Sequence, residues 1–433
     1  MTCAHGWAAI AGSETVFTID SSAITFGRGA IAEIGALAAG LGAKRVALFT
    51  DRGVAKQPIF EAAQRALREA NVDYAVYDAV RVEPTDESFL DAVRFAKDGR
   101  FDAYVSVGGG SVMDTCKAAL LYATYPADFL TYVNKPVGGG VAVPGALPPH
   151  IACPTTCGTG SELTGIAVCD VLSLKAKTGI ASRRLRPTFA VIDPDATRTL
   201  HASVVAASGF DVLCHAVESY TARPFSTKAH AATPAARPMS QGRNQWSDVG
   251  AAEALRVGGE YLVRAVRDAS DDEAREKLSW AATLAGVAFG NAGVHVPHAM
   301  AYAVAGLVRD FKMSGYPDDE PMVPHGISVV TSAPAALRAT AKACPDRHIY
   351  AAHLLGEDRR GAGPNDAGTL LARALERLMR AASVPVGLAP LGYRADDVDA
   401  LTAGTIVQAR LLDNAPLPLD RDAVANIFRD ALR

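Results

Sequence analysis

The spacing of hydrophobic and polar residues divides the chain into two parts of different character. In the first part, short apolar runs of strand length alternate with longer amphipathic segments of helical period. Strands are expected at 46–50, 73–78, 102–107, 150–153 and 189–192, and helices at 29–40, 56–70, 86–98 and 111–121. Such an alternation predicts a parallel sheet with helices on both faces.

After Asp193-Pro-Asp195 the pattern changes to alanine- and leucine-rich segments of helical period. These segments cover 203–222, 248–267, 271–289, 326–343, 366–383, 395–409 and 421–432. They predict a helical second domain, since a chain of 433 residues is too long for one ordinary core. The sequence therefore predicts an α/β domain over residues 1–196 and an all-helical domain over residues 197–433.

A long irregular insertion, residues 223–247, interrupts the predicted helices. Loops of this length inside a compact domain are often functional lids, although a solvated or subunit-contact loop is the alternative. The insertion carries four basic side chains that are candidates for binding a substrate carboxylate. They are Arg223, Lys228, Arg237 and Arg243.

A glycine turn in the first domain has the form of a phosphate-binding site. The apolar segment Phe101–Val107 runs directly into Gly108-Gly-Gly-Ser111, after which an amphipathic helix begins. Glycines let the backbone approach an anion closely, and free N–H groups at the start of a helix bind it. Met113 stands where a G-x-G-x-x-G motif has its third glycine, and a tight turn without a ligand is the alternative.

Three further features of the first domain are candidates for contacting a dinucleotide. Asp51 follows the strand that begins at Arg45, where a carboxylate can accept hydrogen bonds from ribose hydroxyls and repel a 2′-phosphate. The segment Cys153–Glu162 combines small residues with hydroxyl groups, and Lys177 lies further along. The alternatives are a helix cap for Asp51, a plain connection for the loop and a solvated lysine.

Candidate metal ligands lie in the second domain. Asp211 and His215 are four residues apart, so they share one face of a predicted helix. His298 and His325 lie among small, apolar, glycine and proline residues, where an unsatisfied imidazole is costly to bury. One carboxylate and three imidazoles suit a divalent transition ion, although single histidines are more often structural.

The overall composition excludes several classes of partner. A net charge of -3 and a pI near 6.4 argue against a nucleic-acid or membrane surface, and small molecules are the expected partners. Seven cysteines without a C-x-x-C pair indicate free thiols in a reducing compartment. Since residues 1–7 lack the pattern of a secretory signal, the expected location is the cytoplasm.

Taken in order, these segments resemble the iron-containing (group III) alcohol dehydrogenase family. The motifs are Gly108-Gly-Gly-Ser, Pro154-Thr-Thr-Cys-Gly-Thr-Gly-Ser-Glu, Gly209-Phe-Asp-x-x-x-His-Ala-x-Glu218, Pro297-His-Ala-Met and Pro324-His-Gly. Each motif is weak to moderate alone, but five in this order across almost the whole chain are specific. Segments such as Lys177–Ser182 and Gly290–His295 are most similar to the branch that transfers a hydride from a hydroxy acid to an oxo acid.

The resemblance implies a fold and a set of functional residues. The fold is a Rossmann-like dinucleotide-binding domain followed by an all-α metal-binding domain, as in dehydroquinate synthase-like proteins. The implied metal ligands are Asp211, His215, His298 and His325, for Fe²⁺ or Zn²⁺. The implied NAD contacts are Asp51, Gly108, Gly109, Gly110, Ser111, Thr155, Thr156, Thr159, Ser161 and Lys177. A homo-oligomer, dimer or larger, is also implied.

One position departs from the family pattern. Many members have a second histidine four residues after the third metal ligand, whereas this chain has Tyr302 there. Because a phenol is a poor base near neutral pH, Tyr302 is expected to orient the substrate. His295 is the better candidate for carrying a proton, with a structural histidine as the alternative.

The implied activity is hydride transfer between a 4-hydroxybutyrate-like hydroxy acid and a 2-oxoglutarate-like oxo acid through bound NAD. Three alternatives remain open at this stage. The first is an NAD-dependent primary alcohol or 4-hydroxybutyrate dehydrogenase that releases NADH in each cycle. The others are a lyase-type synthase of the same fold, which would need a basic phosphate site, and a metal or nucleotide sensor without turnover.

Overall fold

The computed structural model describes residues 11–433 except 175 and 318–319. The described chain forms two compact units, one of residues 21–199 and one of residues 11–20 together with residues 200–433. The N-terminal residues used to argue against a secretory signal, and Cys3 among them, lie outside the described residues. The sequence placed residues 11–20 in the first domain, whereas the structure groups them with the helical unit.

A six-stranded sheet forms the centre of unit 21–199. Its order is β1-β8-β5-β4-β2-β3, and every neighbouring pair is parallel. The strands are β1 (Ala23–Phe26), β2 (Arg45–Phe49), β3 (Asp73–Tyr77), β4 (Ala103–Gly108), β5 (His150–Pro154) and β8 (Phe189–Ile192). The predicted parallel sheet is confirmed. Strand β1 was not predicted because it has only four residues, two of them exposed.

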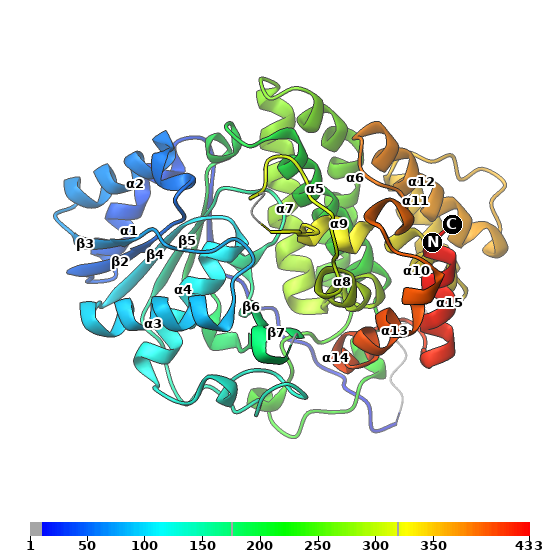
Figure 1. Ribbon diagram of the computed structural model, residues 1–433, viewed down its shortest axis with the longest axis horizontal. Helices are drawn as coiled ribbons and strands as arrows, with labels where there is room; N and C mark the ends of the chain where they lie inside the picture. Colours follow the sequence, from blue (N-terminus) through cyan, green and yellow to red (C-terminus); the bar gives the residue numbers. More distant parts are fainter. Residues whose placement is uncertain (1–10, 175, 318–319) are drawn as a thin grey trace. The chain divides into compact units, whose positions relative to one another are not determined.

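Helices cover both faces of this sheet, as Figure 1 shows. The helices are α1 (Ile34–Gly40), α2 (Pro58–Glu69), α3 (Asp86–Gly99) and α4 (Gly110–Thr124). Alternation along β2 explains the two layers, because successive side chains of a strand point to opposite faces. Val46 and Leu48 pack in the core that contains α1 and α2, whereas Ala47 and Phe49 pack in the core that contains α3 and α4.

A second, two-stranded antiparallel sheet in the same unit was not predicted. It pairs β6 (Ile166–Val171) with β7 (Ala176–Ala181). Strand β6 alternates between buried and partly exposed positions, but its sequence includes Cys169 and Asp170 and gives only a weak strand signal. The pairing places Lys177 opposite Asp170 across the two strands.

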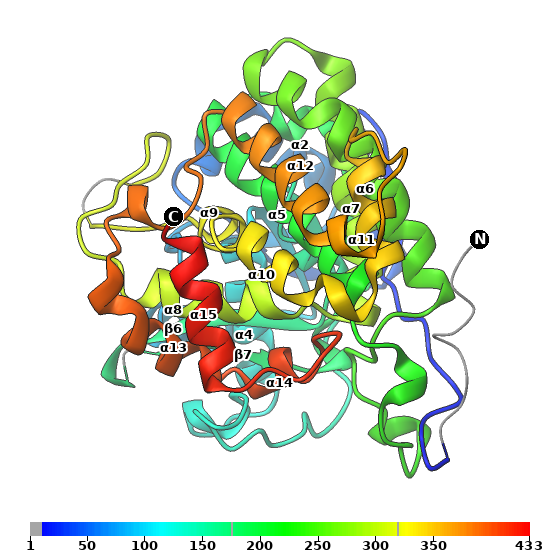
Figure 2. The same ribbon diagram turned by 90° about the vertical axis from the view of Figure 1, so that its right-hand side faces the viewer.

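The other unit is helical, as the sequence predicts, and α5 runs through its middle (Figure 2). Its main helices are α5 (Ala202–Thr221), α6 (Gln245–Arg267), α7 (Asp272–Ala292), α8 (Val296–Gly306), α9 (His325–Val330), α10 (Ala333–Thr340), α11 (Pro345–Leu354), α12 (Ala367–Ala381), α13 (Val398–Ile406), α14 (Ala409–Leu412) and α15 (Arg421–Ala431). The single helix predicted for 326–343 is instead α9, α10 and a 3-10 turn, and Pro334 lies in the first turn of α10. Helices α8 and α11 were missed; each also has a proline in its first turn, where proline is tolerated.

The insertion 223–247 is fastened to the segment 11–20 by buried polar groups. Glu14, only 5% exposed, accepts hydrogen bonds from the backbone N–H of Ala231 and from Arg237 Nε. Its own N–H donates to the carbonyl of Lys228. Further along, the side-chain amide of Gln241 exchanges two hydrogen bonds with the backbone of Thr18. These hydrogen bonds anchor the insertion to the segment 11–20.

We expect Glu14→Ala to loosen the insertion. The change removes a buried acceptor and leaves the amide of Ala231 without this partner, so the melting temperature should fall by roughly 2–4 °C. Hydrogen exchange of backbone amides in residues 228–241 should accelerate. Glu33→Ala is the control, because Glu33 is exposed, and equal exchange in the two variants would contradict the anchoring role.

Candidate metal and dinucleotide sites

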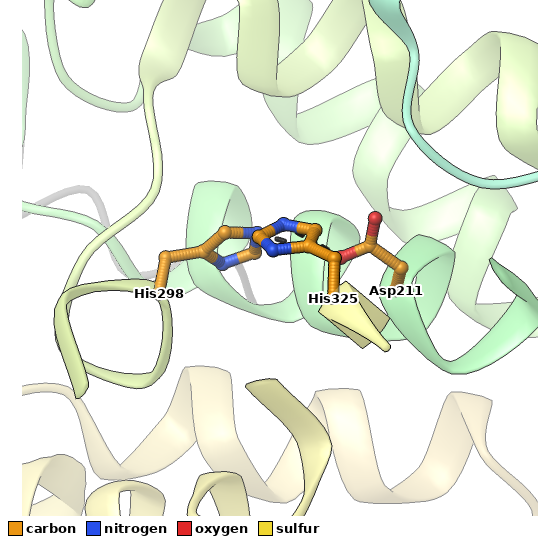
Figure 3. A group of neighbouring side chains, drawn as sticks. All are labelled: Asp211, His298 and His325. Carbon is orange, nitrogen blue, oxygen red and sulfur yellow. Dashed lines mark ion pairs between the residues drawn. The ribbon is translucent and has the colours of Figure 1, made fainter. Parts of the chain in front are cut away.

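Four potential metal-binding side chains converge in the helical unit. Asp211 Oδ1 lies 3.7 Å from His215 Nε2, 3.5 Å from His298 Nε2 and 3.8 Å from His325 Nε2. Figure 3 shows three of these residues, Asp211, His298 and His325, directed toward one another. Their donor atoms all lie within 4.8 Å of each other, which is close enough to share one ion.

Three helices supply these residues. Asp211 and His215 come from consecutive turns of α5, as their spacing predicted. His298 lies in the first turn of α8, and His325 is the first residue of α9. The ring of Phe289 on α7 stacks on His215 with 3.8 Å between ring centroids and restricts the orientation of that imidazole.

The glycine that follows His325 permits the close packing of α9 against α5. A Cβ atom on Gly326 would lie 1.9 Å from the carbonyl oxygen of Ala207 and 3.1 Å from Asp211 Cβ. No larger residue fits there without moving the two helices apart. The Pro-His-Gly motif therefore reflects a packing requirement that brings His325 to Asp211.

The electrostatics of the cluster favour a bound cation. Asp211, His215 and His298 are at most 4% exposed, and His325 is partly exposed. Burial alone would raise the pKa of Asp211, but the surrounding imidazoles hold it well below its usual range. Asp211 Oδ1 and His298 Nε2 are buried without a hydrogen-bond partner among the described residues. Buried polar atoms normally have partners, and a divalent ion would provide one here.

A second carboxylate, Glu218, orients the ligand His298. Glu218 is fully buried, and its Oε1 lies 2.6 Å from His298 Nδ1. Its other oxygen accepts hydrogen bonds from the backbone N–H groups of His295 and His298. Burial lowers the pKa of His298, but Glu218 and Asp211 outweigh it and raise that pKa to about 10. Such carboxylate–histidine pairs fix ligand orientation in metal sites.

The spacing of Glu218 from the two candidate ligands on α5 could have identified it in the sequence. It follows Asp211 by seven residues and His215 by three, so all three share one face of α5. The motif containing Glu218 was noted, but no role was assigned to this residue.

The glycine turn of the α/β unit lies at the switch point of the sheet. Strand β2 leads through α2 to β3 on one side, and β4 leads through α4 to β5 on the other. Asp51 follows β2 and Gly108–Ser111 follows β4, so both lie at the carboxyl ends of adjacent strands. Ligands of doubly wound sheets bind at this position.

The turn itself has no room for side chains. A Cβ on Gly110 would lie 2.8 Å from Thr159 Cγ2, and one on Gly109 would lie 3.4 Å from Thr156 Cγ2. Helix α4 begins at Gly110 without a side-chain cap. The hydroxyl of Thr156 is buried without a hydrogen-bond partner among the described residues. A bare helix start beside this hydroxyl fits the phosphates of a dinucleotide.

Several other proposed dinucleotide contacts have protein partners. Asp51 Oδ1 accepts hydrogen bonds from the N–H groups of Gly53 and Val54, as the cap alternative expects. Lys177 is not a solvated lysine, because its Nζ lies 2.5 Å from a carboxylate oxygen of Glu83 and 3.3 Å from one of Asp170. The backbone N–H of Glu83 donates to Ser111 Oγ, and Thr155 donates its N–H to the Gly108 carbonyl.

The two proposed catalytic residues have different surroundings. His295 is fully buried, and its Nε2 lies 3.0 Å from Thr221 Oγ1. The hydroxyl of Thr221 donates to the carbonyl of Val217, so His295 Nε2 carries the hydrogen that Thr221 accepts. Burial lowers the pKa of His295 to about 4. Tyr302 is partly exposed on α8 and packs against an apolar cluster that includes Phe289, Val294 and Leu411.

The basic residues of the insertion are engaged within the helical unit. Arg223 and Lys228 lie 3.0 and 3.5 Å from Asp413, and Arg237 donates to Thr18. Arg243 is 6% exposed. The structure therefore shows these four cations committed to partners or buried, which differs from the expected role in binding a substrate carboxylate.

The fold and the two candidate sites fit a metal-dependent dehydrogenase, with the nucleotide held by the α/β unit and the metal by the helical unit. Residues 21–194 match the family model "Iron-containing alcohol dehydrogenase". Residues 205–432 match "Fe-containing alcohol dehydrogenase family, C-terminal". The chain therefore belongs to the iron-containing alcohol dehydrogenase family of oxidoreductases, as its motifs predicted. Membership implies a nicotinamide dinucleotide and a divalent metal as cofactors.

Curated relatives resemble the whole chain. It is 48% identical over 423 residues to the mitochondrial hydroxyacid-oxoacid transhydrogenase of Xenopus tropicalis and 46% identical to that of Homo sapiens. Each match covers 97% of this chain and 91% of the relative. A probable mitochondrial hydroxyacid-oxoacid transhydrogenase of Dictyostelium discoideum is 41% identical and covers 97% of this chain and 80% of the relative.

Solved structures of the family share the fold. A 1,3-propanediol oxidoreductase structure is 29% identical, with a TM-score of 0.84 over 96% of this chain and 100% of that chain. NADH-dependent butanol dehydrogenase A from Thermotoga maritima has a TM-score of 0.80 over 98% of this chain and 99% of that chain. Its 22% identity supports likeness of fold alone.

The prediction of a cytoplasmic protein is wrong, because the related transhydrogenases carry names that place them in the mitochondrion. It rested on free cysteines and on a short N-terminal stretch. Free thiols indicate a reducing environment but do not distinguish one reducing compartment from another. Among the described helices, none has both the length and the apolar character needed to span a bilayer.

We expect Glu218→Gln to weaken metal binding about 10- to 100-fold, because the partner that orients His298 loses its charge. Affinity can be measured by competition with a chelator on the full-length protein. His298→Ala should lose most of the metal, and Glu253→Gln on the exposed side of α6 should lose none. Wild-type affinity in Glu218→Gln would show that His298 is oriented without this carboxylate.

Proposed function

We propose that the protein is a hydroxyacid-oxoacid transhydrogenase, which moves a hydride from a hydroxy acid to an oxo acid through bound NAD. The observation that carries the proposal is the 46–48% identity, over 97% of this chain, to relatives with that name. The site supports it as well, since the helical unit has candidate ligands for the metal and the glycine turn of the α/β unit is a candidate site for NAD.

The proposed substrates are 4-hydroxybutyrate and 2-oxoglutarate. 4-Hydroxybutyrate loses a hydride from its alcohol carbon and a proton from its hydroxyl group, and becomes succinate semialdehyde. 2-Oxoglutarate gains a hydride at its carbonyl carbon and a proton at the oxygen, and becomes 2-hydroxyglutarate. The two half-reactions balance, so no net oxidant is consumed.

When bound, a divalent ion supplies a Lewis acid for the substrate oxygen, and NAD supplies the hydride carrier. We propose Fe²⁺ as the ion, while Zn²⁺ accepts the same ligands. The proposed ligands are Asp211, His215, His298 and His325. Metal analysis after anaerobic purification identifies the ion.

The residues of the α/β unit are proposed to hold the dinucleotide. Backbone N–H groups of Gly109, Gly110 and Ser111 at the start of α4 would bind the phosphates. Thr156 would add its buried hydroxyl, and Asp51 would accept from a ribose hydroxyl through the oxygen that does not cap the following turn.

The structure leads us to revise the proposed proton carrier. His295 is fully buried, its Nε2 is bonded to Thr221 and its backbone N–H donates to Glu218, so we propose that it is a structural histidine and does not exchange protons with substrate. Tyr302 stays a proposed substrate-orienting residue, because it is partly exposed and follows His298 by one turn of α8.

We also propose a homo-oligomer, dimer or larger. Trp246 and Val249 are 56% and 71% exposed on α6, and exposed apolar side chains of this size are common at subunit interfaces. The remaining partner is the small-molecule substrate of a dehydrogenase.

Turnover without added NAD tests the proposed activity against its nearest alternative. A transhydrogenase that retains its cofactor should convert 4-hydroxybutyrate and 2-oxoglutarate repeatedly when the protein is freed of external nucleotide by gel filtration. Each active site should form many molecules of 2-hydroxyglutarate, detected by chromatography. Formation of only one equivalent, with continued turnover when NAD is supplied and NADH is released, would identify an ordinary alcohol dehydrogenase.

Asp51 is expected to set the preference for NAD over NADP. In Asp51→Asn the amide oxygen can still accept from Gly53 and Val54, but the negative charge that repels a 2′-phosphate is gone. The ratio of NADPH to NADH affinity should rise about ten-fold or more, because juxtaposed like charges cost several kcal/mol. Fluorescence titration of both nucleotides measures the ratio, and a wild type that binds NADPH as tightly as NADH would refute the prediction.

A further inference from the structure

A buried lysine in the α/β unit has no part in the sites described above. Lys117 lies on α4 and is 0% exposed. Its Nζ donates to the carbonyl of Ser161 at 2.7 Å, to the hydroxyl of Ser161 at 2.5 Å and to the carbonyl of Ile166 at 2.8 Å. The three acceptors match the three hydrogens of a charged ammonium group, and Asp114 opposes the lowering of the Lys117 pKa that burial causes.

A carboxylate one turn earlier on α4 compensates this charge. Asp114 Oδ1 lies 3.6 Å from Lys117 Nζ and 2.5 Å from Ser161 Oγ. Its Oδ2 accepts from the backbone N–H of Val168 on β6. The pair therefore joins α4 to the loop at Ser161 and to the neighbouring two-stranded sheet. Burying an ion pair is costly unless such additional hydrogen bonds satisfy it.

The only hydrogen of the Ser161 hydroxyl is used in this network. The hydroxyl donates it to Asp114 and accepts a hydrogen from Lys117. Ser161 therefore cannot donate a hydrogen bond from its hydroxyl to the dinucleotide while it is bonded to Asp114.

The hydrogen bonds of Ser161 also connect this network to the glycine turn. The N–H of Ser161 donates to Thr159 Oγ1 at 3.3 Å. Thr159 in turn packs against the turn where α4 begins, since its Cγ2 lies 2.8 Å from where a Cβ on Gly110 would be. The position of Thr159 thus depends on a loop that Lys117 holds from inside the unit.

We propose that Lys117 is a positioning residue for the dinucleotide site, acting through Ser161 and Asp114 to fix the 155–161 loop over the glycine turn. This inference rests on the dinucleotide-binding part of the proposed function. A preformed loop avoids the entropic cost of ordering on binding, so loss of the anchor should weaken nucleotide affinity.

A double-mutant cycle on NADH affinity tests the proposal. Lys117→Met and Ser161→Ala, made in the full-length protein, should each raise the NADH dissociation constant about ten-fold, and the double variant should resemble Lys117→Met instead of showing the product of both effects. Lys97→Met is the control for the substitution, because Lys97 is exposed on α3. Titrations are run by NADH fluorescence at a temperature where every variant is folded.

Melting temperature and NADH affinity together distinguish a lysine that positions the loop from one that only stabilises the fold. A purely structural lysine would lower the melting temperature and leave the NADH affinity of the folded protein unchanged, and this result would overturn the proposal. Multiplicative effects of the two changes would do the same, because Ser161 would then act independently of Lys117. Metal content should equal that of the wild type in all variants, since the ligands belong to the other unit.

If Lys117→Met does not fold, the cycle is run with Asp114→Asn in its place. Asparagine keeps an acceptor for Val168 but removes the charge opposite Lys117, and the same non-additivity with Ser161→Ala is expected. A wild type that fails to bind NADH would remove the dinucleotide part of the proposed function as well. A wild type that binds NADH, with variants of equal affinity, would overturn only the role of Lys117.

Discussion

The helical unit depends on the burial of two carboxylates, Asp211 and Glu218, on a single helix. A buried anion is tolerated only where positive charge and hydrogen bonds compensate it. Three imidazoles surround Asp211, and His298 lies between the two carboxylates with one ring nitrogen directed at each. The packing of α8 and α9 against α5 serves this compensation, and Gly326 permits the closest of those approaches. The same charges that constrain the fold create the affinity for a divalent cation.

The α/β unit also buries a charged group, but here the charge is positive. Lys117 is a buried cation, Asp114 compensates its charge, and three neutral oxygens accept its hydrogen bonds. In both units a buried charged network lies directly behind residues proposed to touch a ligand. Such networks restrict side-chain rotamers that packing alone would leave free, and preorganisation of this kind lowers the cost of binding.

Features set by neighbouring residues could be predicted from the sequence, whereas features set by contacts between distant residues could not. The alternation of strands and helices predicted the parallel sheet, and the i, i+4 spacing on α5 predicted that Asp211 and His215 lie together, because both are properties of nearby residues. His298 and His325 were candidates because of their small, apolar, glycine and proline neighbours, and the family resemblance then implied that they join Asp211 and His215, since no local rule joins residues so far apart. The partners of Glu218, which lies in a recognised motif, and of Lys117, which follows the glycine turn by six residues, were missed because only the folded chain brings them together. The predicted helix over 326–343 is interrupted between Val330 and Ala333, because Pro334 has no N–H to donate to the carbonyl of Val330 as a continuous helix requires.

Retention of the cofactor is the property that separates a transhydrogenase from a dehydrogenase of the same fold. The two activities can share the metal ligands and the glycine turn, so their difference must lie in how slowly the dinucleotide leaves. A slow release follows from contacts that need no reordering when the ligand binds, because the free energy of each contact is then expressed in affinity. The loop at 155–161 meets this condition, since Thr159 is packed against the turn and Ser161 is bonded from beneath. On the proposed function, the hydrogen bonds from Lys117 to Ser161 would therefore slow the release of the dinucleotide by holding this loop in place.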